Sequence, residues 1–573
     1  DPGSAAHPLR VRPGGGTRGH GGRERCRASG RRPGRGSAMA GTAGQPATVL
    51  VVGAGPVGLT AACELARQGA RVRVVEAMPE PTTQSRAVVV HARTQEHLAA
   101  MGVLDELTAR AVEITAVEVR SGPAGTLRLR APTTGIDSRY PRALDTPQPA
   151  TEAVLAALAA RLGVAVERGV TLTDLAQDRD GVDVTLASAA GTARQRVGWV
   201  VGADGGRSRV RAAVGERIEG VPDGEHFLFA DVAAATTLPT DTIRLFAGPD
   251  GVSGAFPMPD GRTRFLLQVP PPGPVARPTL DEVQRLVDDR MGEHWRLSDP
   301  RWLVGFEVHH GQVERYRHGR VLLAGDAAHV HSPAGGQGMN TGMQDAVNLA
   351  WKLALVSTGR AADALLDSYH AERHPVGAAV VRQTTRLTHA VATQGPRGHL
   401  RDAGLLLLGH LPAVGDAVAA GLAEVRLRYR GSPVVGGGDG VRGACPGDHA
   451  PDPPGLTDAG GSPLRVGDLL RRPGHLLLTT CLSRTSHDRL RAVLGGLGTV
   501  VPVLPAPPRP GPRDGPVLVD PGGAVAARYG IGHDGAALVR PDGYLGYLSA
   551  RTDPVAVARH LADREHVLAV GAG

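Results

Sequence analysis

The segment Thr48–Ala77, TVLVVGAGPVGLTAACELARQGARVRVVEA, restricts the fold more than any other part of the chain. An apolar run leads into Gly53, Gly55 and Gly58, and a helical pattern, a second apolar run and Glu76 follow. Glycines at this spacing allow a tight turn, the approach of a pyrophosphate and close helix–strand packing, while the acid can accept from a ribose hydroxyl. The segment predicts a Rossmann-like unit for a dinucleotide, and it does not choose between FAD and a nicotinamide cofactor.

A second glycine-rich segment, Gly319–Lys352, reads GRVLLAGDAAHVHSPAGGQGMNTGMQDAVNLAWK. The apolar run Val321–Ala324 is typical of a buried parallel strand, and Asp326 follows it closely. Four glycines then let the backbone approach a bulky group, and a helical pattern begins at about Thr341. A strand-end carboxylate, a glycine-rich turn and a helix N-terminus are the parts that hold a polyhydroxylated cofactor.

The third segment, Trp199–Arg211, reads WVVGADGGRSRVR. A buried strand again ends in an acid, Asp204, which is followed by Gly205, Gly206 and several arginines. Taken alone, an ordinary strand, turn and helix with a solvated basic face explains this pattern as well as a cofactor site does. Its place between the other two segments gives it weight.

In this order, the three segments resemble the class A flavin monooxygenases, which are single-chain FAD-dependent aromatic hydroxylases. Their GxGxxG, DG and GD motifs match Gly53–Gly58, Asp204–Gly205 and Gly325–Asp326. The neighbouring segments SRAVVVHARTQEHLAAMGV and PQPATEAVL are also similar to the family, and the resemblance covers roughly residues 47 to 390. Within the family, the chain is most similar to actinomycete aromatic polyketide hydroxylases and to the rifampicin and phenol monooxygenases.

The resemblance implies an α/β fold with a Rossmann-like FAD-binding domain of the p-hydroxybenzoate hydroxylase type. We expect a basic, disordered leader at 1–38 and the FAD-binding domain at 39–215 and again at 310–395. A mostly antiparallel β-sheet substrate domain is expected at 216–309, because short strands alternate there with turn signals. A helical linker at 396–430 and a thioredoxin-like domain without CxxC at 431–573 complete the prediction.

The resemblance also implies which residues contact the cofactor. Backbone amides at Gly338, Met339 and Asn340, ahead of the helix, are expected to face the flavin, and Asp326 its ribityl or pyrophosphate region. Pro333 and Gly338 are expected to position the flavin, and we identify no catalytic base. The full set of expected cofactor-binding residues is Gly53, Gly55, Pro56, Val57, Gly58, Glu76, Ala77, Arg86, Arg93, Gln148, Asp204, Gly205, Gly325, Asp326, Pro333, Gly336, Gly338, Met339 and Asn340.

The reaction implied is that of the family: NADPH or NADH reduces FAD, dioxygen is taken up, and a flavin hydroperoxide hydroxylates a phenolic ring. A polycyclic polyketide of secondary metabolism is the predicted substrate. A small-phenol degradative hydroxylase, a Baeyer–Villiger oxygenase and an antibiotic-inactivating monooxygenase remain alternatives on the same fold, and a non-enzymatic flavin- or drug-binding protein is disfavoured. A halogenase is disfavoured, because the chain lacks a WxWxIP segment and its one lysine, Lys352, lies on the helix after the GD motif.

Five of the six phenylalanines fall in the predicted substrate sheet: Phe227, Phe229, Phe246, Phe256 and Phe265. Core packing and a flat apolar pocket explain this clustering equally well. A small carboxylated substrate would need a buried arginine, which Arg244, Arg262 or Arg264 could supply. We expect structural or solvated roles for His226, His309, His310 and Asp231, and a local structural role for His329.

Charge limits the partners. Residues 1–38 hold nine Arg against two acids, a net charge of +7, so almost all of the net charge of +8 lies outside the folded body. The body therefore lacks the basic excess of a nucleic-acid-binding surface. No apolar run is long enough to cross a membrane, and the four cysteines show no metal-binding or CxxC spacing. These features predict a cytoplasmic protein without a metal site. The resemblance implies an enzyme, monomeric or homodimeric, whose partners are an aromatic substrate and dioxygen.

Overall fold

The computed structural model describes residues 48–568, apart from 86, 122–125, 131–136, 221–224, 249–250, 271–276, 293, 309, 333–335, 393–423 and 509–514. Two expected cofactor residues, Arg86 and Pro333, lie outside the described residues, as do His309, the predicted leader at 1–38 and most of the predicted linker at 396–430. The described residues belong to one unit, Pro46–Gly573.

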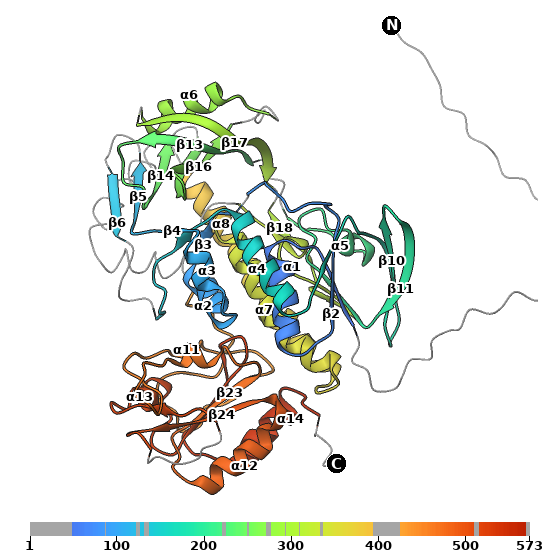
Figure 1. The fold of residues 1–573 in the computed structure, drawn as a ribbon, viewed down its shortest axis with the longest axis vertical. Helices are drawn as coiled ribbons and strands as arrows, with labels where there is room; N and C mark the ends of the chain where they lie inside the picture. Colours follow the sequence, from blue (N-terminus) through green and yellow to red (C-terminus); the bar gives the residue numbers. More distant parts are fainter. Residues whose placement is uncertain are drawn as a thin grey trace, which may run out of the picture. The chain divides into compact units, whose positions relative to one another are not determined.

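A six-stranded sheet forms the centre of the first half of this unit (Figure 1), in the order β19-β20-β12-β1-β2-β8. Its strands are β1 (Val49–Val52), β2 (Val72–Glu76), β8 (Val166–Arg168), β12 (Trp199–Gly202), β19 (Arg317–His318) and β20 (Val321–Leu323). All neighbours pair in parallel except β19 with β20. Each residue of β1 is buried, as expected for an apolar strand that is covered on both faces.

Helix α1 (Pro56–Arg67) packs against both α7 (Gly338–Ser357) and α4 (Gln148–Arg161), and Figure 1 shows the three side by side. Helix α7 begins at Gly338, three residues before the predicted start, because its first turn is built from residues that the sequence assigned to the glycine-rich turn. Further helices of this half are α2 (Ala92–Ala100), α3 (Leu104–Thr108), α5 (Arg209–Ala213) and α8 (Asp367–Ala392), with the short η2 (Gly325–Ala327) and η3 (Asp363–Leu366).

The second sheet has seven strands in the order β17-β13-β16-β15-β14-β5-β6. The strands are β5 (Ala116–Ser121), β6 (Thr126–Arg130), β13 (Glu225–Thr236), β14 (Thr242–Gly248), β15 (Gly251–Met258), β16 (Arg262–Val269) and β17 (Trp295–Val308). The prediction of an antiparallel sheet limited to 216–309 missed β5 and β6, which extend it through a parallel pairing of β5 with β14. Helix α6 (Leu280–Met291) covers one face with an apolar cluster that includes Phe265 and Trp295.

Three smaller sheets complete this half. One contains β9 (Thr171–Gln177), β10 (Val182–Ser188) and β11 (Gly191–Val197). The next contains β3 (Val89–Val90), β7 (Leu144–Asp145) and β4 (Val112–Glu113), and the last pairs β18 (Gly311–Gln312) with β21 (His329–Val330). The β3-β7-β4 sheet matters for the site, because it lies between the glycine-rich segments and strand β15.

The C-terminal region forms a third large sheet, drawn in orange and red in Figure 1, in the order β22-β27-β26-β23-β24-β25. Its strands are β22 (Gly436–Gly437), β23 (His475–Thr479), β24 (Gly498–Leu504), β25 (Leu518–Val519), β26 (Ala536–Val539) and β27 (Leu545–Ser549). The helices are α11 (Val466–Leu469), α12 (Arg484–Leu494), α13 (Ala524–Tyr529), α14 (Pro554–Asp563) and the short η4 (Gly495–Leu497).

The C-terminal sheet has two apolar cores. One lies wholly within the region, whereas the other also contains Trp351 and Leu355 from α7, and Ala361 and Leu365 from the loop and turn that follow. The C-terminal region therefore shares a core with the helix that follows the GD motif.

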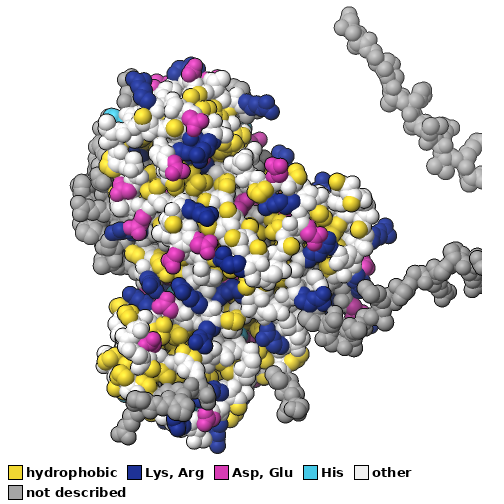
Figure 2. Space-filling model, in the orientation of Figure 1, with side chains coloured by type: hydrophobic (Ala, Val, Ile, Leu, Met, Phe, Trp, Pro, Cys, Tyr) yellow, Lys and Arg dark blue, Asp and Glu magenta, His cyan; other side chains and the backbone are white. Residues whose placement is uncertain are grey.

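The outer surface is chemically mixed. On the face drawn in Figure 2, basic and acidic side chains are interspersed among apolar and neutral ones. Among the described residues, no helix combines the length and apolarity needed to cross a bilayer, and no group of His, Cys, Asp and Glu is arranged to hold a metal ion.

Candidate functional site

The first glycine turn joins β1 to α1. Gly53 has a φ of +106°, and a Cβ on it would lie 2.3 Å from the carbonyl oxygen of Ala203, which follows β12. A Cβ on Gly58 would lie 2.0 Å from the carbonyl oxygen of Gly53, whereas no heavy atom lies within 4 Å of a Cβ on Gly55. Two of the glycines are therefore required by packing, and Gly55 leaves open space at the N-terminus of α1, where Pro56 starts the helix.

Glu76 ends β2 beside this turn. Its carboxylate accepts hydrogen bonds from the backbone N–H groups of Ala54 at 2.7 Å and of Met78 at 2.9 Å. Ala77, which follows Glu76 in the sequence, is exposed. The acid is thus held against the glycine turn by backbone donors, at the place that the sequence predicts.

The second turn follows β12 and abuts the first, since a Cβ on Gly53 would lie 3.0 Å from the Cα of Asp204. The Asp204 carboxylate accepts from the N–H groups of Arg209 at 2.7 Å and Val210 at 3.1 Å. It therefore caps the N-terminus of α5 instead of pointing away from the protein. Gly205, with a φ of +78°, makes the turn that allows this.

The third turn, Gly325–Asp326, packs against α1 and α7. A Cβ on Gly325 would lie 2.8 Å from Val57, and one on Gly342 would lie 2.7 Å from the same side chain. Asp326 is exposed, and its carboxylate accepts no hydrogen bond from a described residue. Arg211 donates to the backbone carbonyls of Asp326 and Ala327 at 3.3 and 3.1 Å, which links the second turn to the third.

The N-terminus of α7 completes this group. Its N-cap, Gln337, makes no side-chain capping bond, so donors of the first turn, including those of Gly338 and Met339, are not capped by that side chain. Asn340 is fully buried and holds the turn in place: its amide donates to the carbonyls of Val89 and Gly336, and its oxygen accepts from the His91 N–H.

Two other predicted residues differ in their placement. Gln148 lies against the residues on either side of Arg86. Its side-chain oxygen accepts from the Ala87 N–H at 3.2 Å, and its backbone N–H donates to the Ser85 hydroxyl at 2.9 Å. The Arg93 side chain instead pairs with Glu96 and lies 5.7 Å from the ring centre of Tyr544. The structure therefore places Gln148 with the predicted flavin segments and turns Arg93 towards the C-terminal region.

The sequence did not predict a buried ionic group that lies behind the third turn. Asp345 on α7 accepts from the Gly325 N–H at 3.1 Å and from Arg373 at 2.7 Å, and it pairs with His329 at 2.7 Å. His329 is therefore buried in an ion pair, and the structural role expected for it stays a prediction. Burial and the neighbouring His329 lower the pKa of His331, whose ring faces Gly338, to about 4. A run of apolar helix broken by Asp345 was the only signal in the sequence.

The seven-stranded sheet separates its aromatic residues by face. Phe265 and Phe246 pack under α6 with Trp295. On the other face, Phe227, Phe229 and Phe256 gather with Trp302 and Phe306. Phe265 and Phe246 therefore pack under α6. The other three predicted phenylalanines lie on the face that α6 does not cover, where Phe227 and Phe229 are themselves buried in an apolar cluster.

Buried charges lie on this second face. Arg262 and Arg264 both bind Asp231, at 2.8 and 3.0 Å, and Arg264 also donates to the carbonyl of Ser85. The Arg264 guanidinium lies 5.9 Å from the ring centre of Phe229 and 5.2 Å from that of Trp302. The aromatic face is therefore tied to the segment that carries Arg86.

Asp145 of β7 lies beside this group and was not predicted. Its side chain is fully buried, and neither carboxylate oxygen has a hydrogen-bond partner among the described residues. Burial raises its pKa well above the usual value, and the charge of Arg264 opposes that effect. The Nε of Arg264 is likewise buried, and no described residue pairs with it. Unpaired buried polar atoms of both signs point to a missing partner.

The histidines expected to be structural include His310, which pairs with Glu225 at 3.3 Å and accepts from the Ser332 N–H at 3.1 Å. The described residues around the three turns fit FAD on three counts: open space at Gly55, an exposed Asp326 carboxylate, and the N-terminus of α7 without a side-chain cap. All three turns meet around Gly53 and Val57.

Comparison with known proteins agrees with this geometry. The sequence model of a family described as "FAD binding domain" matches residues 46–384. The 6-methylpretetramide 4-monooxygenase of Streptomyces rimosus is 36% identical over 533 residues, which cover 90% of this chain and 92% of that protein.

Two solved structures have the same fold. An anhydrotetracycline hydroxylase from Streptomyces rimosus superimposes with a TM-score of 0.74 at 31% identity, covering 91% of this chain and all of the other. A ternary complex of aklavinone-11 hydroxylase with FAD and aklavinone gives a TM-score of 0.73 at 30% identity, covering 91% and 99% of the two chains. The chain belongs to the FAD-binding-domain family of flavin-dependent aromatic monooxygenases.

Proposed function

We propose that this monooxygenase hydroxylates a flat, polycyclic phenolic compound of the polyketide class, with NADPH or NADH as reductant and dioxygen as co-substrate. One observation carries the substrate class: the aromatic face of the seven-stranded sheet is joined by Arg264 to the carbonyl of Ser85, next to the predicted flavin segments. A broad aromatic surface suits stacking of a fused-ring ligand better than it suits a single small ring.

The cofactor roles proposed for the three turns follow from their geometry. The pyrophosphate lies in the open space at Gly55, the adenosine ribose accompanies Glu76, and the ribityl chain accompanies Asp326. The first-turn amides of α7 face the flavin ring and favour negative charge on it. Asp204 supports the site by capping α5, and Arg93 is omitted from the cofactor contacts because its charge is used by Glu96.

FAD, once bound, supplies the redox chemistry, and the residues of this chain bind it, orient it and exclude water. The electron-rich ring of a phenol needs no strong acid from the protein. Asp145 and Arg264 are proposed to hold the polar substituents of the substrate, because both present buried polar atoms that have no partner among the residues described.

The C-terminal sheet is proposed to be thioredoxin-like. The order β24-β23-β26-β27, with α12 between the first two strands in sequence and α13 before β26, supports this assignment. A disulfide role is not part of the proposal, since Cys445 and Cys481 are free and the sequence has no CxxC. Its free thiols also suit a protein of the cytoplasm.

Replacement of Asp326 by alanine tests the cofactor placement. A carboxylate that accepts from ribityl hydroxyls contributes about 1.5–3 kcal/mol, so the dissociation constant of FAD should rise by roughly tenfold or more while the melting temperature of the apoprotein stays the same. Fluorescence titration with FAD measures the first quantity. An unchanged FAD affinity in Asp326→Ala would place the flavin elsewhere.

The substrate class is tested by NADPH oxidation in the presence of a tetracyclic phenol and, separately, of hydroxybenzoate. The tetracyclic phenol should stimulate oxidation and be hydroxylated. A small carboxylated phenol is the second candidate, and it is favoured by the Nε of Arg264, which no described residue engages. If only hydroxybenzoate stimulates NADPH oxidation and is hydroxylated, the polyketide assignment is wrong although the flavin chemistry stands.

A further inference from the structure

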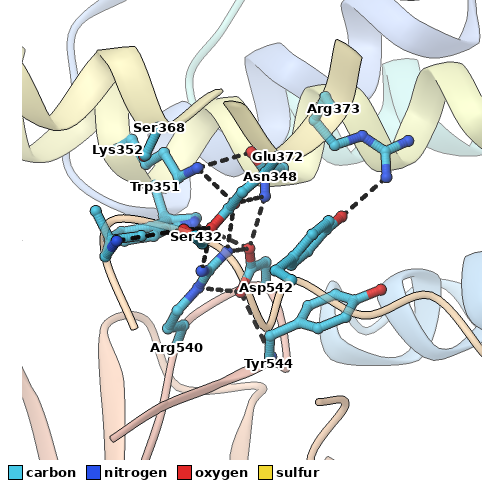
Figure 3. A network of polar contacts seen from close by, with 12 residues as sticks. Asn348, Trp351, Lys352, Ser368, Glu372, Arg373, Ser432, Arg540, Asp542 and Tyr544 are labelled. Atoms are coloured by element: carbon cyan, nitrogen blue, oxygen red, sulfur yellow. Dashed lines mark hydrogen bonds and ion pairs between the residues drawn. The ribbon is translucent and has the colours of Figure 1, made fainter. Parts of the chain in front are cut away.

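A continuous buried network joins the C-terminal region to the helices around the third turn (Figure 3). Glu372 on α8 lies at its centre and accepts from Arg540 through both oxygens, at 2.6 and 2.9 Å. Lys352 and Asn348 on α7 donate to the same carboxylate at 2.7 and 2.6 Å. We call Asn348, Trp351, Lys352, Glu372, Ser432, Arg540 and Asp542 the interdomain network.

A tight turn of the C-terminal sheet presents two members of this network. The sequence Arg540-Pro541-Asp542-Gly543 links β26 to β27, and the Gly543 N–H donates to the Arg540 carbonyl at 2.9 Å. Proline, aspartate and a glycine with a φ of +81° are the residues that such a turn favours. Asp542 accepts from Asn348 at 3.1 Å and from the indole of Trp351 at 3.2 Å.

A second set of contacts leads from this network to the third turn. Arg373, next to Glu372, donates to the Tyr429 hydroxyl at 2.9 Å and to the Thr341 carbonyl, in the first turn of α7, at 3.0 Å. It also donates to Asp345, whose other oxygen accepts from the Gly325 N–H. Tyr429 in turn lies 5.5 Å from the guanidinium of Arg540.

The charges along this path balance. Arg540, Lys352 and Arg373 are matched by Glu372, Asp542 and Asp345, and all six side chains are buried. Both oxygens of Glu372 are occupied, and the side-chain polar atoms of these six residues all have hydrogen-bond partners. Removal of one charge would leave another unpaired in the interior, so the set holds together or fails together.

We propose that the C-terminal region completes the flavin site, with Arg540 as a positioning residue that fixes the Gly325–Asp326 turn and the first turn of α7. Arg540 acts through Glu372 and Arg373, neighbours on α8, and through the bond from Arg373 to Asp345. The apolar core shared with Trp351 and Leu355 holds the same helix from its other end. The inference rests on the proposed position of the flavin at the start of α7.

The test compares three variants of the full-length protein. Arg540→Gln removes the charge, Arg540→Lys keeps it, and Arg528→Gln is the matched control. Arg528 also reaches from the C-terminal region to the first half, but its pair with Asp137, at 2.6 Å, is about half exposed. Each variant is titrated with FAD well below its melting temperature, and the visible circular dichroism of the flavin is recorded at saturation.

The proposal expects Arg540→Gln to weaken FAD binding by about three- to thirtyfold and to change the flavin circular dichroism, with partial recovery in Arg540→Lys. Arg528→Gln should match the wild type in both. If Arg540→Gln lowers the melting temperature but keeps the wild-type FAD affinity and flavin spectrum, the network is only structural and the proposal is wrong.

If Arg540→Gln does not fold, Tyr429→Phe removes one hydroxyl and no charge, and the same two measurements apply with smaller expected changes. Asp326→Ala distinguishes a failure of the proposed flavin position from a failure of the positioning role of Arg540. Wild-type FAD affinity in Asp326→Ala would refute the flavin position itself. Weakened binding there with no effect at Arg540 would refute only the positioning role.

Discussion

Two buried ionic clusters of this enzyme differ in whether their polar atoms have hydrogen-bond partners among the described residues. In the interdomain network, Glu372 meets Arg540, Lys352 and Asn348 with both carboxylate oxygens occupied. In the cluster beside the aromatic face, Asp145 is as deeply buried, and within the part of the chain that the structure describes neither its carboxylate nor the Nε of Arg264 has a hydrogen-bond partner.

This difference indicates which of the two clusters is expected to bind a ligand. A closed cluster has no capacity for another partner, so it holds elements together. An open cluster leaves polar atoms without compensation for lost hydration, which costs about 1–3 kcal/mol for each group, and a bound substrate can recover that cost. The predictions below test this contrast.

The largest effect should follow the loss of Glu372. Glu372→Met leaves Arg540 and Lys352 buried without that partner, and breaking a buried pair on one side costs about 3–5 kcal/mol. Equilibrium unfolding in urea measures this loss. Glu314→Gln is the control, because its pair with Arg315 is exposed and surface changes of this kind stay within about 0.5 kcal/mol. Equal stability of the two variants would refute the closed character of the network.

A smaller, different effect is expected at Arg264. Arg264→Met should raise the KM for the polycyclic substrate by roughly tenfold or more, since hydrogen bonds to charged groups contribute about 1.5–3 kcal/mol. Arg262 is the matched control, because it lies on the same face of β16 but is fully engaged by Asp231 and Asp299. Arg262→Met should lose stability and keep its KM. Steady-state kinetics on both variants would contradict the contrast if their KM values rose alike.

The smallest effect should be seen at Asp145, and it depends on pH. Burial raises the pKa of this carboxyl in the folded state, so the folded protein binds the proton more tightly than the unfolded chain does. The group therefore stabilises the fold below its unfolded pKa, and that stability is lost as pH rises through the raised value. Asp145→Asn, which cannot ionise, should melt at a higher temperature than the wild type at neutral pH.

Calorimetry at several pH values follows this difference, which should shrink as the medium becomes acidic. A variant that melts below the wild type at neutral pH would mean that the Asp145 carboxylate is charged and satisfied in the free enzyme. The cluster would then be closed, and its proposed part in substrate binding would fail.

The sequence predicted most of the frame, because the frame is local. Strand β20 and helix α7 begin within a few residues of the positions expected from their patterns, and Gly53 needs its positive φ for the reason given by the fingerprint. Strand β5 joined the substrate sheet unpredicted, because its parallel partner β14 lies more than a hundred residues away and leaves no local trace.

Candidate site residues that follow a predicted strand or motif could be proposed from the sequence. Residues that only packing brings to their partners could not. Asp326 is exposed after a strand, as its place in the sequence suggests, and its contact with the cofactor stays a prediction. Asp204 has the same position and is turned inwards by the N-terminus of α5. Asp145 and Arg373 lie in segments with no motif, and only the folded chain brings them to their partners.

The central claim is that this flavin monooxygenase places one oxygen atom from dioxygen on a polycyclic phenol. Mass spectrometry of the product formed by the FAD-loaded enzyme, NADPH and a tetracyclic phenol under ¹⁸O₂ tests it most directly. We expect the product formed under ¹⁸O₂ to contain one ¹⁸O atom. The product formed when only the water is labelled should contain none. NADPH oxidation that yields hydrogen peroxide and unaltered phenol, or label from water, would contradict it.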